Sequence, residues 1–317
     1  MNPSTLLNQH DFPIIVVNEV RFMRIAVIGS GTMGQLFGAK LSVNNEVTMV
    51  SRRKEIALLI QNEGIVLKEA NEEKVYKPDA TTTPCGHYDL LLVFTKAYDA
   101  ENALEMYNNI IDKDTLILSL MNGAGHENRL PEGSLLGITQ DGAYRTSENH
   151  VVHSGMGGLT TFGRIDGNNE DLDKLVDIFN KAGFKTELSS NIRYTVWHKL
   201  IINASSSVLS GILGVKQGVV YTNPEAWEIC KDLITEICLV AEKEGIHFDT
   251  AEQIDRLKNH LINNPDGYTS IYSDLKNGRK TEVDYISGTV YNTGLKYGLD
   301  LKSHKLMIAM VHAKENI

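Results

Sequence analysis

The chain has 317 residues, of which 42% are hydrophobic, and its formal net charge is −9 at pH 7. This length favours about two domains, and the hydrophobic content is sufficient for ordinary globular cores. The negative charge argues against a nucleic-acid-binding surface, but it leaves room for a local basic pocket that binds a small anion. The three cysteines lack metal-site spacing, and we interpret them as small buried residues of a protein from the reducing cytoplasm.

The apolar stretches are too short to cross a membrane, because a span needs about 18 apolar residues. The run 12–17 follows Asp11 rather than basic residues, so it is not typical of a signal peptide. Residues 1–22 precede the first recognisable motif, and we expect them to be a poorly ordered N-terminal extension. We therefore expect a cytoplasmic protein without a membrane partner.

A glycine-rich turn joins the first predicted strand to the first predicted helix. Residues 24–28 indicate a buried strand, and residues 35–41 indicate a helix. Between them the chain reads Gly29-Ser30-Gly31-Thr32-Met33-Gly34. In this context Gly29 permits a tight turn, Gly31 lets a pyrophosphate approach the backbone, and Gly34 lets helix and strand pack closely. We interpret the motif as dinucleotide-binding; the alternative is a glycine turn in an unrelated α/β protein.

The end of the second predicted strand bears on the choice of dinucleotide. Residues 46–51 run into Arg52-Arg53-Lys54, and no acidic residue stands at the strand end. An acidic residue there would bind the ribose hydroxyls of NAD(H), whereas arginine pairs with the 2′-phosphate of NADP(H). We therefore predict NADP(H); the alternative is a solvated basic run.

The remaining elements follow from periodicity and from turn and cap residues. Further strands are predicted at 88–96, 115–120 and 135–139, a hairpin-type excursion at 65–67 and 72–76, and late, antiparallel strands at 151–155 and 158–163. Helices are predicted at 100–111, 172–182, 195–209, 225–244, 250–263, 268–276, 282–297 and 303–314. This order predicts an α/β protein with a Rossmann-type dinucleotide-binding domain at 23–190 and an all-helical substrate domain at 191–317.

A polar stripe on the first helix of the second domain is the candidate catalytic element. Lys199, Asn203 and Ser207 are spaced by four residues, which places them on one helix face. A partly buried lysine has a lowered pKa and can donate a proton to a ketone oxygen while a hydride reaches the carbon. A lysine on a solvated helix face is the commoner cause of such spacing, so the spacing alone does not assign catalysis.

Two further segments carry candidate site residues. Glu282 stands at a predicted helix start, where the dipole favours its charged form, and it would orient Lys199 or a substrate hydroxyl. Ordinary helix capping is the alternative. Ser270 and Asp274 share a helix face just upstream, and Ser270 is a candidate for binding a substrate carboxylate.

Taken together, several ordered motifs resemble the ketopantoate reductase (2-dehydropantoate 2-reductase) family. They are Gly29-x-Gly31-x-x-Gly34, Lys96-Ala97, Asn122-Gly123, Trp197-His198-Lys199-Leu200-x-x-Asn203 and Thr281-Glu282-Val283-Asp284-Tyr285-Ile286-Ser287-Gly288. The resemblance extends from about residue 23 to the C-terminus. It implies NADPH-dependent reduction of ketopantoate to pantoate, on the route to pantothenate and coenzyme A.

The resemblance also implies roles for individual residues. Lys199 is the general acid, and Glu282 orients the site and contacts the nicotinamide ribose. Arg52 binds the 2′-phosphate, and Lys96 and the Ala143 backbone complete the cofactor contacts. Asn122 contacts cofactor and substrate. The implied substrate-binding residues are Asn203, Ser207, Gln217 and Ser270. Ser207 and Gln217 stand where some members carry asparagine. These differences would change the contacts to the tail of the substrate, so they bear on which 2-oxo acid is bound and not on the type of reaction.

Two alternatives to ketopantoate reduction remain open. One is an NADPH-dependent reductase of another small 2-oxo acid, and the other is a non-catalytic NADP(H)-binding regulator. The helical second domain is also expected to offer a face for a homodimer.

Overall fold

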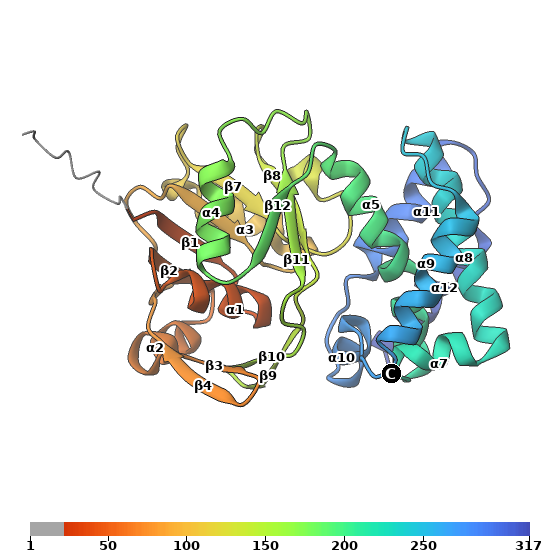
Figure 1. Ribbon diagram of the computed structural model, residues 1–317, viewed down its shortest axis with the longest axis horizontal. Helices are drawn as coiled ribbons and strands as arrows, with labels where there is room; N and C mark the ends of the chain where they lie inside the picture. Colours follow the sequence, from red (N-terminus) through yellow and green to blue (C-terminus); the bar gives the residue numbers. More distant parts are fainter. Residues whose placement is uncertain (1–21) are drawn as a thin grey trace, which may run out of the picture.

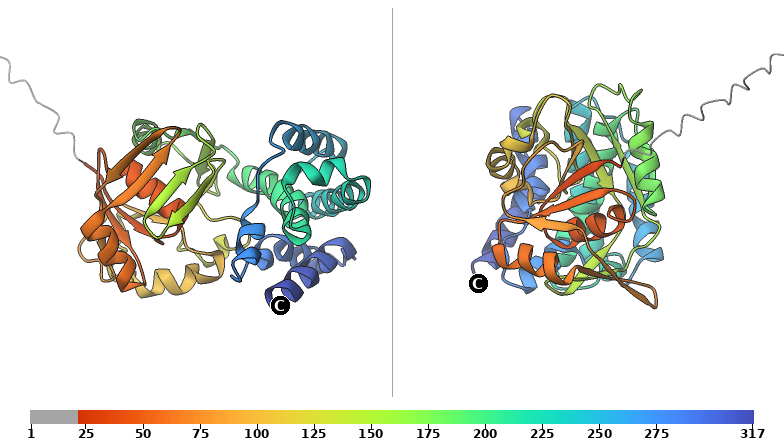
Figure 2. Two further views of the ribbon diagram at one scale, coloured as in Figure 1. Left: turned by 90° about the horizontal axis from the view of Figure 1, so that it is seen from below. Right: turned by 90° about the vertical axis from the view of Figure 1, so that its left-hand side faces the viewer.

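The computed structural model describes residues 22–317. The expectation for the N-terminal extension therefore lies outside the described residues, except for the exposed Phe22. Strands with helices between them make up the chain up to Leu188, and helices make up the chain from Ile192 to Glu315. The two parts lie side by side in Figures 1 and 2. The predicted class, a Rossmann-type α/β part followed by a helical part, is confirmed.

The larger sheet has its strands in the order β12-β11-β8-β7-β6-β1-β2-β5. Its strands are β1 (Arg24–Ile28), β2 (Glu46–Val50), β5 (Asp79–Thr81), β6 (Leu90–Val93), β7 (Leu116–Ser119), β8 (Leu135–Thr139), β11 (Leu159–Gly163) and β12 (Lys185–Leu188). Neighbouring strands of this sheet are parallel, except that β8 and β11 are antiparallel to each other. Because β1 lies between β2 and β6, the strand order reverses there, and ligands of such sheets bind at the carboxyl ends of the strands around that point.

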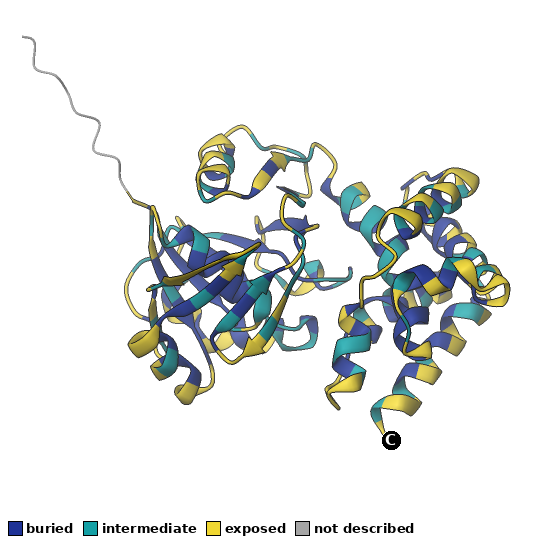
Figure 3. Cartoon of the chain, turned by 60° about the horizontal axis from the view of Figure 1, so that its bottom comes forward, coloured by how far each residue is buried: buried dark blue, intermediate teal, exposed yellow. Residues whose placement is uncertain are grey.

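The central strands are apolar because both faces of the sheet are covered. In β1, Ile25 and Val27 pack into one hydrophobic cluster, which includes Phe37 of α1, and Ala26 and Ile28 pack into another. Alternate side chains of a strand point to opposite faces, so a doubly covered strand shows a continuous apolar run. Figure 3 shows these central strands as buried. The predicted strand 88–96 is shorter in the structure, where β6 comprises Leu90–Val93.

A second sheet, in the order β4-β3-β10-β9, packs beside α1. It consists of β3 (Ile65–Glu69), β4 (Glu72–Tyr76), β9 (Ala143–Ser147) and β10 (His150–His153). The predicted hairpin is present, since β3 and β4 are antiparallel. The two late strands each have an antiparallel partner, but β10 pairs with β9 and β11 pairs with β8, so they belong to different sheets.

The helices around the sheets are short. They are α1 (Thr32–Leu41), α2 (Lys54–Glu63), α3 (Ala100–Met106) and α4 (Asp173–Lys181), with 3₁₀ turns η1 (Ala97–Asp99), η2 (Asn108–Ile110) and η3 (Glu127–Arg129). The predicted helix 100–111 ends early, because the chain continues from α3 into the 3₁₀ turn at two asparagines, which are weak helix formers.

The helical part has one continuous hydrophobic core. Its elements are α5 (Ile192–Ile202), the π-helical turn η4 (Asn203–Ser207), α6 (Val208–Leu213), α7 (Gln217–Thr222), α8 (Pro224–Lys243), α9 (Thr250–Asn263), α10 (Ser270–Lys276), the 3₁₀ turn η5 (Val283–Tyr285), α11 (Ser287–Lys296) and α12 (Lys302–Glu315). Helix α8 begins as its sequence predicts: Asn223 accepts from the Ala226 N–H at 2.9 Å, and Pro224 occupies the first turn.

The predicted helix 282–297 is wrong in its first turn. Thr281 Oγ1 accepts from the Val283 N–H at 3.2 Å, which forms a local turn instead of a helix cap. The 3₁₀ turn η5 follows, and α11 begins only at Ser287, because Ile286 (φ −105°, ψ −91°) is neither helical nor extended. Glu282 therefore lies in the connection before α11 and not in its first turn.

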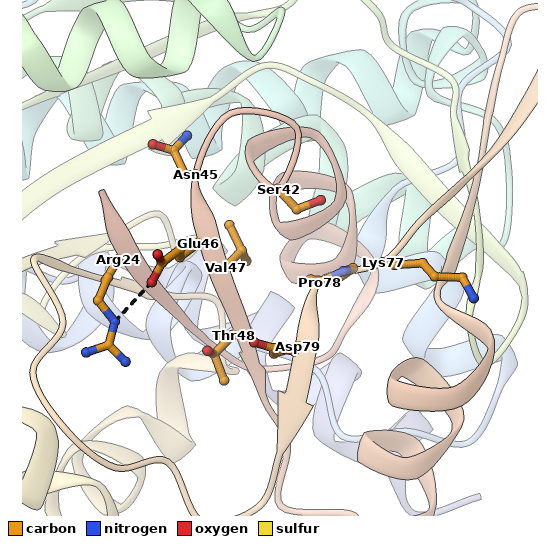
Figure 4. A pocket seen from close by; sticks show the side chains of 9 residues that line it. All are labelled: Arg24, Ser42, Asn45, Glu46, Val47, Thr48, Lys77, Pro78 and Asp79. Carbon is orange, nitrogen blue, oxygen red and sulfur yellow. Dashed lines mark ion pairs between the residues drawn. The ribbon is translucent and has the colours of Figure 1, made fainter. Parts of the chain in front are cut away.

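A polar pocket of about 210 Å³ lies at the amino ends of β1, β2 and β5. The glycine turn lies at the other end of these strands, after the carboxyl end of β1. Figure 4 shows its lining side chains, which include Arg24 at the start of β1 and Glu46 at the start of β2. Arg24 and Glu46 form an ion pair at 3.4 Å. Within residues 22–317, no helix is long and apolar enough to span a membrane.

Candidate active site

The glycine turn has the geometry that each of its glycines predicts. Gly29 has φ +110°, and a Cβ there would lie 2.7 Å from the carbonyl oxygen of Phe94. A Cβ on Gly34 would lie 1.9 Å from the carbonyl oxygen of Gly29, so helix α1 packs directly on the turn. Gly31 faces open space. The first N–H groups of α1 have no side-chain cap, so an anion can bind them.

The Lys199 ammonium reaches from α5 to the carboxyl edge of the sheet. Its Nζ donates to Asn122 Oδ1 at 3.0 Å and to the Thr139 carbonyl oxygen at 3.0 Å. Asn122 follows β7, and Thr139 ends β8. Both contacts therefore bind the lysine to the strand ends of the other part of the molecule, and Figure 1 shows α5 at that junction.

The surroundings of Lys199 weaken its charged form. Burial lowers its pKa to about 8 from the ordinary 10.5, and the negative charge of Glu282 opposes this effect. Leu200 and Ile201 on the same helix are buried in the helical core, which fixes the direction of the lysine. A lysine with such a pKa exchanges a proton readily near neutral pH.

A glycine fixes the position of Asn122. Gly123 has φ +87°, and a Cβ there would lie 2.2 Å from the Tyr285 carbonyl oxygen. That same carbonyl accepts from the Ala124 N–H at 3.0 Å. The loop after β7 therefore docks on η5 so closely that only glycine fits, and this contact presents Asn122 to Lys199.

The predicted continuous helix 195–209 is wrong, because a π-helical turn interrupts it at Asn203–Ser207. The serines bond back to the preceding turn: Ser205 to the Ile201 carbonyl, and Ser206 to the Ile202 carbonyl at 3.4 Å. Such bonds offer the backbone an alternative to the regular ladder. The π turn carries Asn203 at its start and Ser207 at its end.

The predicted substrate-binding residues have different surroundings. Ser207 is buried, and its Oγ accepts from Gln217 Nε2 at 3.2 Å. Thr269 Oγ1 donates to the Ser207 carbonyl at 3.2 Å, which brings the start of α10 beside the π turn. Asn203 is partly buried, whereas Ser270, the first residue of α10, is exposed. The structure thus joins Ser207 to Gln217 and leaves Ser270 facing solvent.

Glu282 binds Lys96 and not Lys199. Its Oε2 accepts from Lys96 Nζ at 3.2 Å, and its Oε1 accepts from the Ala97 N–H at 3.0 Å. Lys96 Nζ also donates to Asp274 Oδ2 at 2.7 Å. Burial lowers the pKa of Lys96, but the charges of Glu282 and Asp274 outweigh it and raise that pKa. The described hydrogen bonds of Glu282 thus go to Lys96 and Ala97, and its charge raises the pKa of Lys199. That Glu282 orients Lys199 or a substrate hydroxyl stays a prediction.

Ala143 begins β9 directly after a close backbone crossing. The Gly142 carbonyl accepts from the N–H groups of Ser154 and Gly155, at 2.8 and 2.9 Å. A Cβ on Gly155 would lie 2.6 Å from Gly142 N. This crossing ties the segment that follows Thr139, the last residue of β8, to the end of β10.

A buried charged network supports the same segment. His153 bonds to Asp141 Oδ1 at 2.9 Å and to Glu69 Oε1 at 2.7 Å, and Lys40 donates to Glu69 Oε1 at 2.7 Å. Thr139 Oγ1 donates to Asp141 Oδ2 at 3.1 Å. The network therefore connects α1 and the second sheet to the strand end that binds Lys199.

The arginines after β2 each face a carboxylate. Arg52 Nη2 donates to Asp99 Oδ2 at 2.8 Å, and Arg53 Nη2 donates to Glu148 Oε2 at 2.7 Å. Ser30 Oγ donates to Ser51 Oγ at 2.8 Å, which connects the glycine turn to the end of β2. Sequence reasoning missed Asp99, since it lies far along the chain and reaches Arg52 only through the strand order. It also missed the Thr139 carbonyl, a backbone group that leaves no side-chain signal.

This combination of a glycine-rich turn on a parallel sheet with a partly buried lysine at the carboxyl ends of the same strands defines a nicotinamide-dinucleotide oxidoreductase. Family models described as "Ketopantoate reductase PanE/ApbA" and "Ketopantoate reductase PanE/ApbA C terminal" match residues 25–167 and 191–315. The chain belongs to the ketopantoate reductase family, whose curated relatives are oxidoreductases that act on a CH–OH group.

Three proteins show how similar this chain is to known sequences and structures. A 2-dehydropantoate 2-reductase of Pyrococcus horikoshii is 31% identical over 93% of this chain and 98% of its own. One of Streptococcus pyogenes serotype M6 is 29% identical over 93% of this chain and 99% of its own. The solved ternary structure of D-mandelate dehydrogenase with NADH and anilino(oxo)acetate has a TM-score of 0.87 and 30% identity, covering 93% of this chain and 99% of that one.

Proposed function

We propose that this protein reduces 2-dehydropantoate (ketopantoate) to (R)-pantoate with NADPH, and that Lys199 is the general acid. The observation that carries the proposal is the position of the Lys199 ammonium, bound to Asn122 and to the Thr139 carbonyl at the strand ends of the dinucleotide-binding sheet. In this assignment residues 23–190 bind the cofactor and residues 191–317 supply the proton donor and most of the substrate contacts.

The glycine turn supports the cofactor assignment. Open space at Gly31 and uncapped N–H groups at the start of α1 fit a pyrophosphate. In this proposal residues 29–34, Lys96, Asn122, the Ala143 backbone and Glu282 hold the cofactor, and Arg52 binds its 2′-phosphate. Arginine suits that role because its guanidinium is always charged and bonds two oxygens at once. The bound cofactor supplies a hydride to the ketone carbon.

Lys199 completes the reaction by giving its proton to the ketone oxygen. The two acceptors on Nζ hold the ammonium in place without removing its charge, since an amide and a backbone carbonyl are neutral. Its lowered pKa of about 8 places the donor near working pH, where general acids are most effective. The ketone thereby gains a hydride at carbon and a proton at oxygen, and Lys199 recovers its proton from solvent.

The substrate end of the site is assigned to Asn122, Asn203, Ser207, Gln217 and Ser270. The Ser207–Gln217 hydrogen bond supports a joint role at the substrate tail. Ser270 is exposed, so its hydroxyl is accessible, and we propose that it binds the carboxylate of the substrate. We also propose that the helical part forms a homodimer and that the protein acts in the cytoplasm.

The similarity to D-mandelate dehydrogenase favours a second candidate function, reduction of another 2-oxo acid. Steady-state oxidation of NADPH, measured with ketopantoate, 2-oxoisovalerate, pyruvate and 2-oxo-2-phenylacetate, separates the two candidates. The proposal requires the highest kcat/KM with ketopantoate. A higher value with 2-oxo-2-phenylacetate would assign the second function, and no turnover with any 2-oxo acid would favour a non-catalytic NADP(H)-binding regulator.

A further inference from the structure

The ion pair between Arg52 and Asp99 joins two strand ends that flank the glycine turn. Arg52 follows β2, and Asp99 ends η1, just after β6. Asp99 meets both terminal nitrogens of the guanidinium: Nη2 to Oδ2 at 2.8 Å and Nη1 to Oδ1 at 3.4 Å. Because β2 and β6 both lie next to β1, this pair stands at the edge where the adenosine ribose of a dinucleotide binds in this fold.

The carboxylate that the end of β2 lacks in sequence is thus supplied in space by Asp99. Asp99 occupies the Nη1–Nη2 edge of the Arg52 guanidinium, which is one of the two edges that can bind an oxyanion through two hydrogen bonds. Arg53 offers no free replacement, because Glu148 holds it at 2.7 Å. A phosphate at Arg52 either displaces Asp99 from the Nη1–Nη2 edge or binds the Nε edge beside it, and in both positions it lies close to a like charge.

We propose that Asp99 sets the preference between NADPH and NADH by competing with the 2′-phosphate for Arg52. This inference rests on the dinucleotide binding of the proposed function. A ribose hydroxyl is uncharged and leaves the ion pair intact, so Asp99 weakens NADPH binding and not NADH binding. Asp99 is therefore a specificity residue: the chain has the arginine of an NADP site, but the Asp99 carboxylate binds its guanidinium.

The side chains set the scale of the effect. Asp99 is 24% exposed and Arg52 is 55% exposed, so solvent screens the interaction in part. Removing a partly screened like charge beside a phosphate is worth about a factor of ten in affinity. We therefore expect the Asp99→Asn variant to bind NADPH about tenfold more tightly, while its dissociation constant for NADH changes less than about twofold.

Direct binding titrations without any keto acid test this inference. NADPH and NADH are titrated into wild type, Asp99→Asn, Arg52→Ala and the double variant. The matched control is Glu105→Gln, an exposed acid on α3 whose loss changes net charge equally. If Asp99 acts through Arg52, its substitution has little effect in the Arg52→Ala background, and the control changes neither affinity.

The outcomes separate this inference from the proposed function. An equal change for NADPH and NADH in Asp99→Asn, or an undiminished effect in the Arg52→Ala background, overturns the role of Asp99 and leaves the proposed function standing. Wild-type protein that binds neither dinucleotide overturns both. Because both partners are partly exposed, the variants retain the fold, and thermal melting of each variant verifies this.

Discussion

Lys199 donates a 3.0 Å hydrogen bond to Oδ1 of Asn122, across the junction between the helical part and the sheet. The acceptor is neutral, so it positions the ammonium without stabilising its charge as a carboxylate would. Burial is therefore the main influence on this lysine and lowers its pKa to about 8. The pH dependence of catalysis follows from this relationship.

The reduction rate is expected to fall at alkaline pH. A general acid must carry its proton, so kcat/KM, which follows the pKa values of the free enzyme, should be level below pH 8 and decrease as Lys199 deprotonates above it. The measurement is kcat/KM for the keto acid, from NADPH oxidation between pH 6 and pH 10. Lys199→Arg is the control: its guanidinium stays charged, so its residual activity should show no alkaline decrease in that range. A wild-type profile that is flat to pH 10 would contradict the role of Lys199.

Asn122→Asp should move the alkaline decrease to higher pH. The substitution places a carboxylate where the amide now accepts from Nζ, and an opposite charge at that distance favours the ammonium by about one pH unit or more. Comparison of pH–rate profiles measures the shift. The exposed Asn128→Asp is the matched control and should leave the profile unchanged. An unchanged profile for Asn122→Asp would show that the two side chains are apart during turnover.

Glu282→Gln should move the same decrease the other way. The charge of Glu282 raises the pKa of Lys199, so its removal lowers that pKa below about 8, by roughly half a pH unit. The amide can still accept from the Ala97 N–H, which keeps the local backbone in place. The exposed Asp284→Asn, two residues further on, serves as control. A shift to higher pH in Glu282→Gln would contradict the electrostatic coupling.

The His153 network gives a prediction about stability. Burial lowers the pKa of His153, but its bonds to Asp141 and Glu69 outweigh burial, so the pKa lies above the ordinary 6.5. The stability from the charged imidazolium is then complete below pH 6.5 and is lost as the pH rises through the pKa of the folded protein. His153→Ala should cost about 3 kcal/mol at pH 6 and less at pH 9.

Urea denaturation midpoints at the two pH values measure this difference. His150→Ala, on the same strand but partly exposed, is the control and should change the midpoint little at either pH. A cost for His153→Ala that grows with pH would show that the buried histidine is uncharged in the folded protein.

The parts of the fold that could be predicted depend on local signals. The glycine turn, the buried β1 and the cap of α8 each follow from neighbouring residues, and the structure has all of them. The π turn at Asn203–Ser207 was missed because regular helical spacing gives no sign of an inserted residue; the serine run, whose hydroxyls bond back to the preceding turn, was the available clue. The break before α11 was missed because Thr281 binds locally instead of capping a helix.

The sequence predicted which residues belong to the site better than it predicted their contacts. Lys199 and Asn122 were both selected from the sequence, yet their partnership depends on how two parts of the chain dock, which no local pattern encodes. The same holds for Glu282, which binds Lys96 and Ala97 across the junction. The contact of Asp99 with Arg52 could not be predicted from the sequence, because it depends on the strand order that places β2 and β6 on either side of β1.

Turnover of the Lys199→Ala variant, with ketopantoate and saturating NADPH, tests the central claim most directly. Loss of the general acid should lower kcat by about 10²–10⁴, while the dissociation constant for NADPH, measured by titration on the same preparation, stays within about twofold of wild type. Undiminished turnover in this variant would contradict the account, because another group would then be giving its proton to the ketone oxygen.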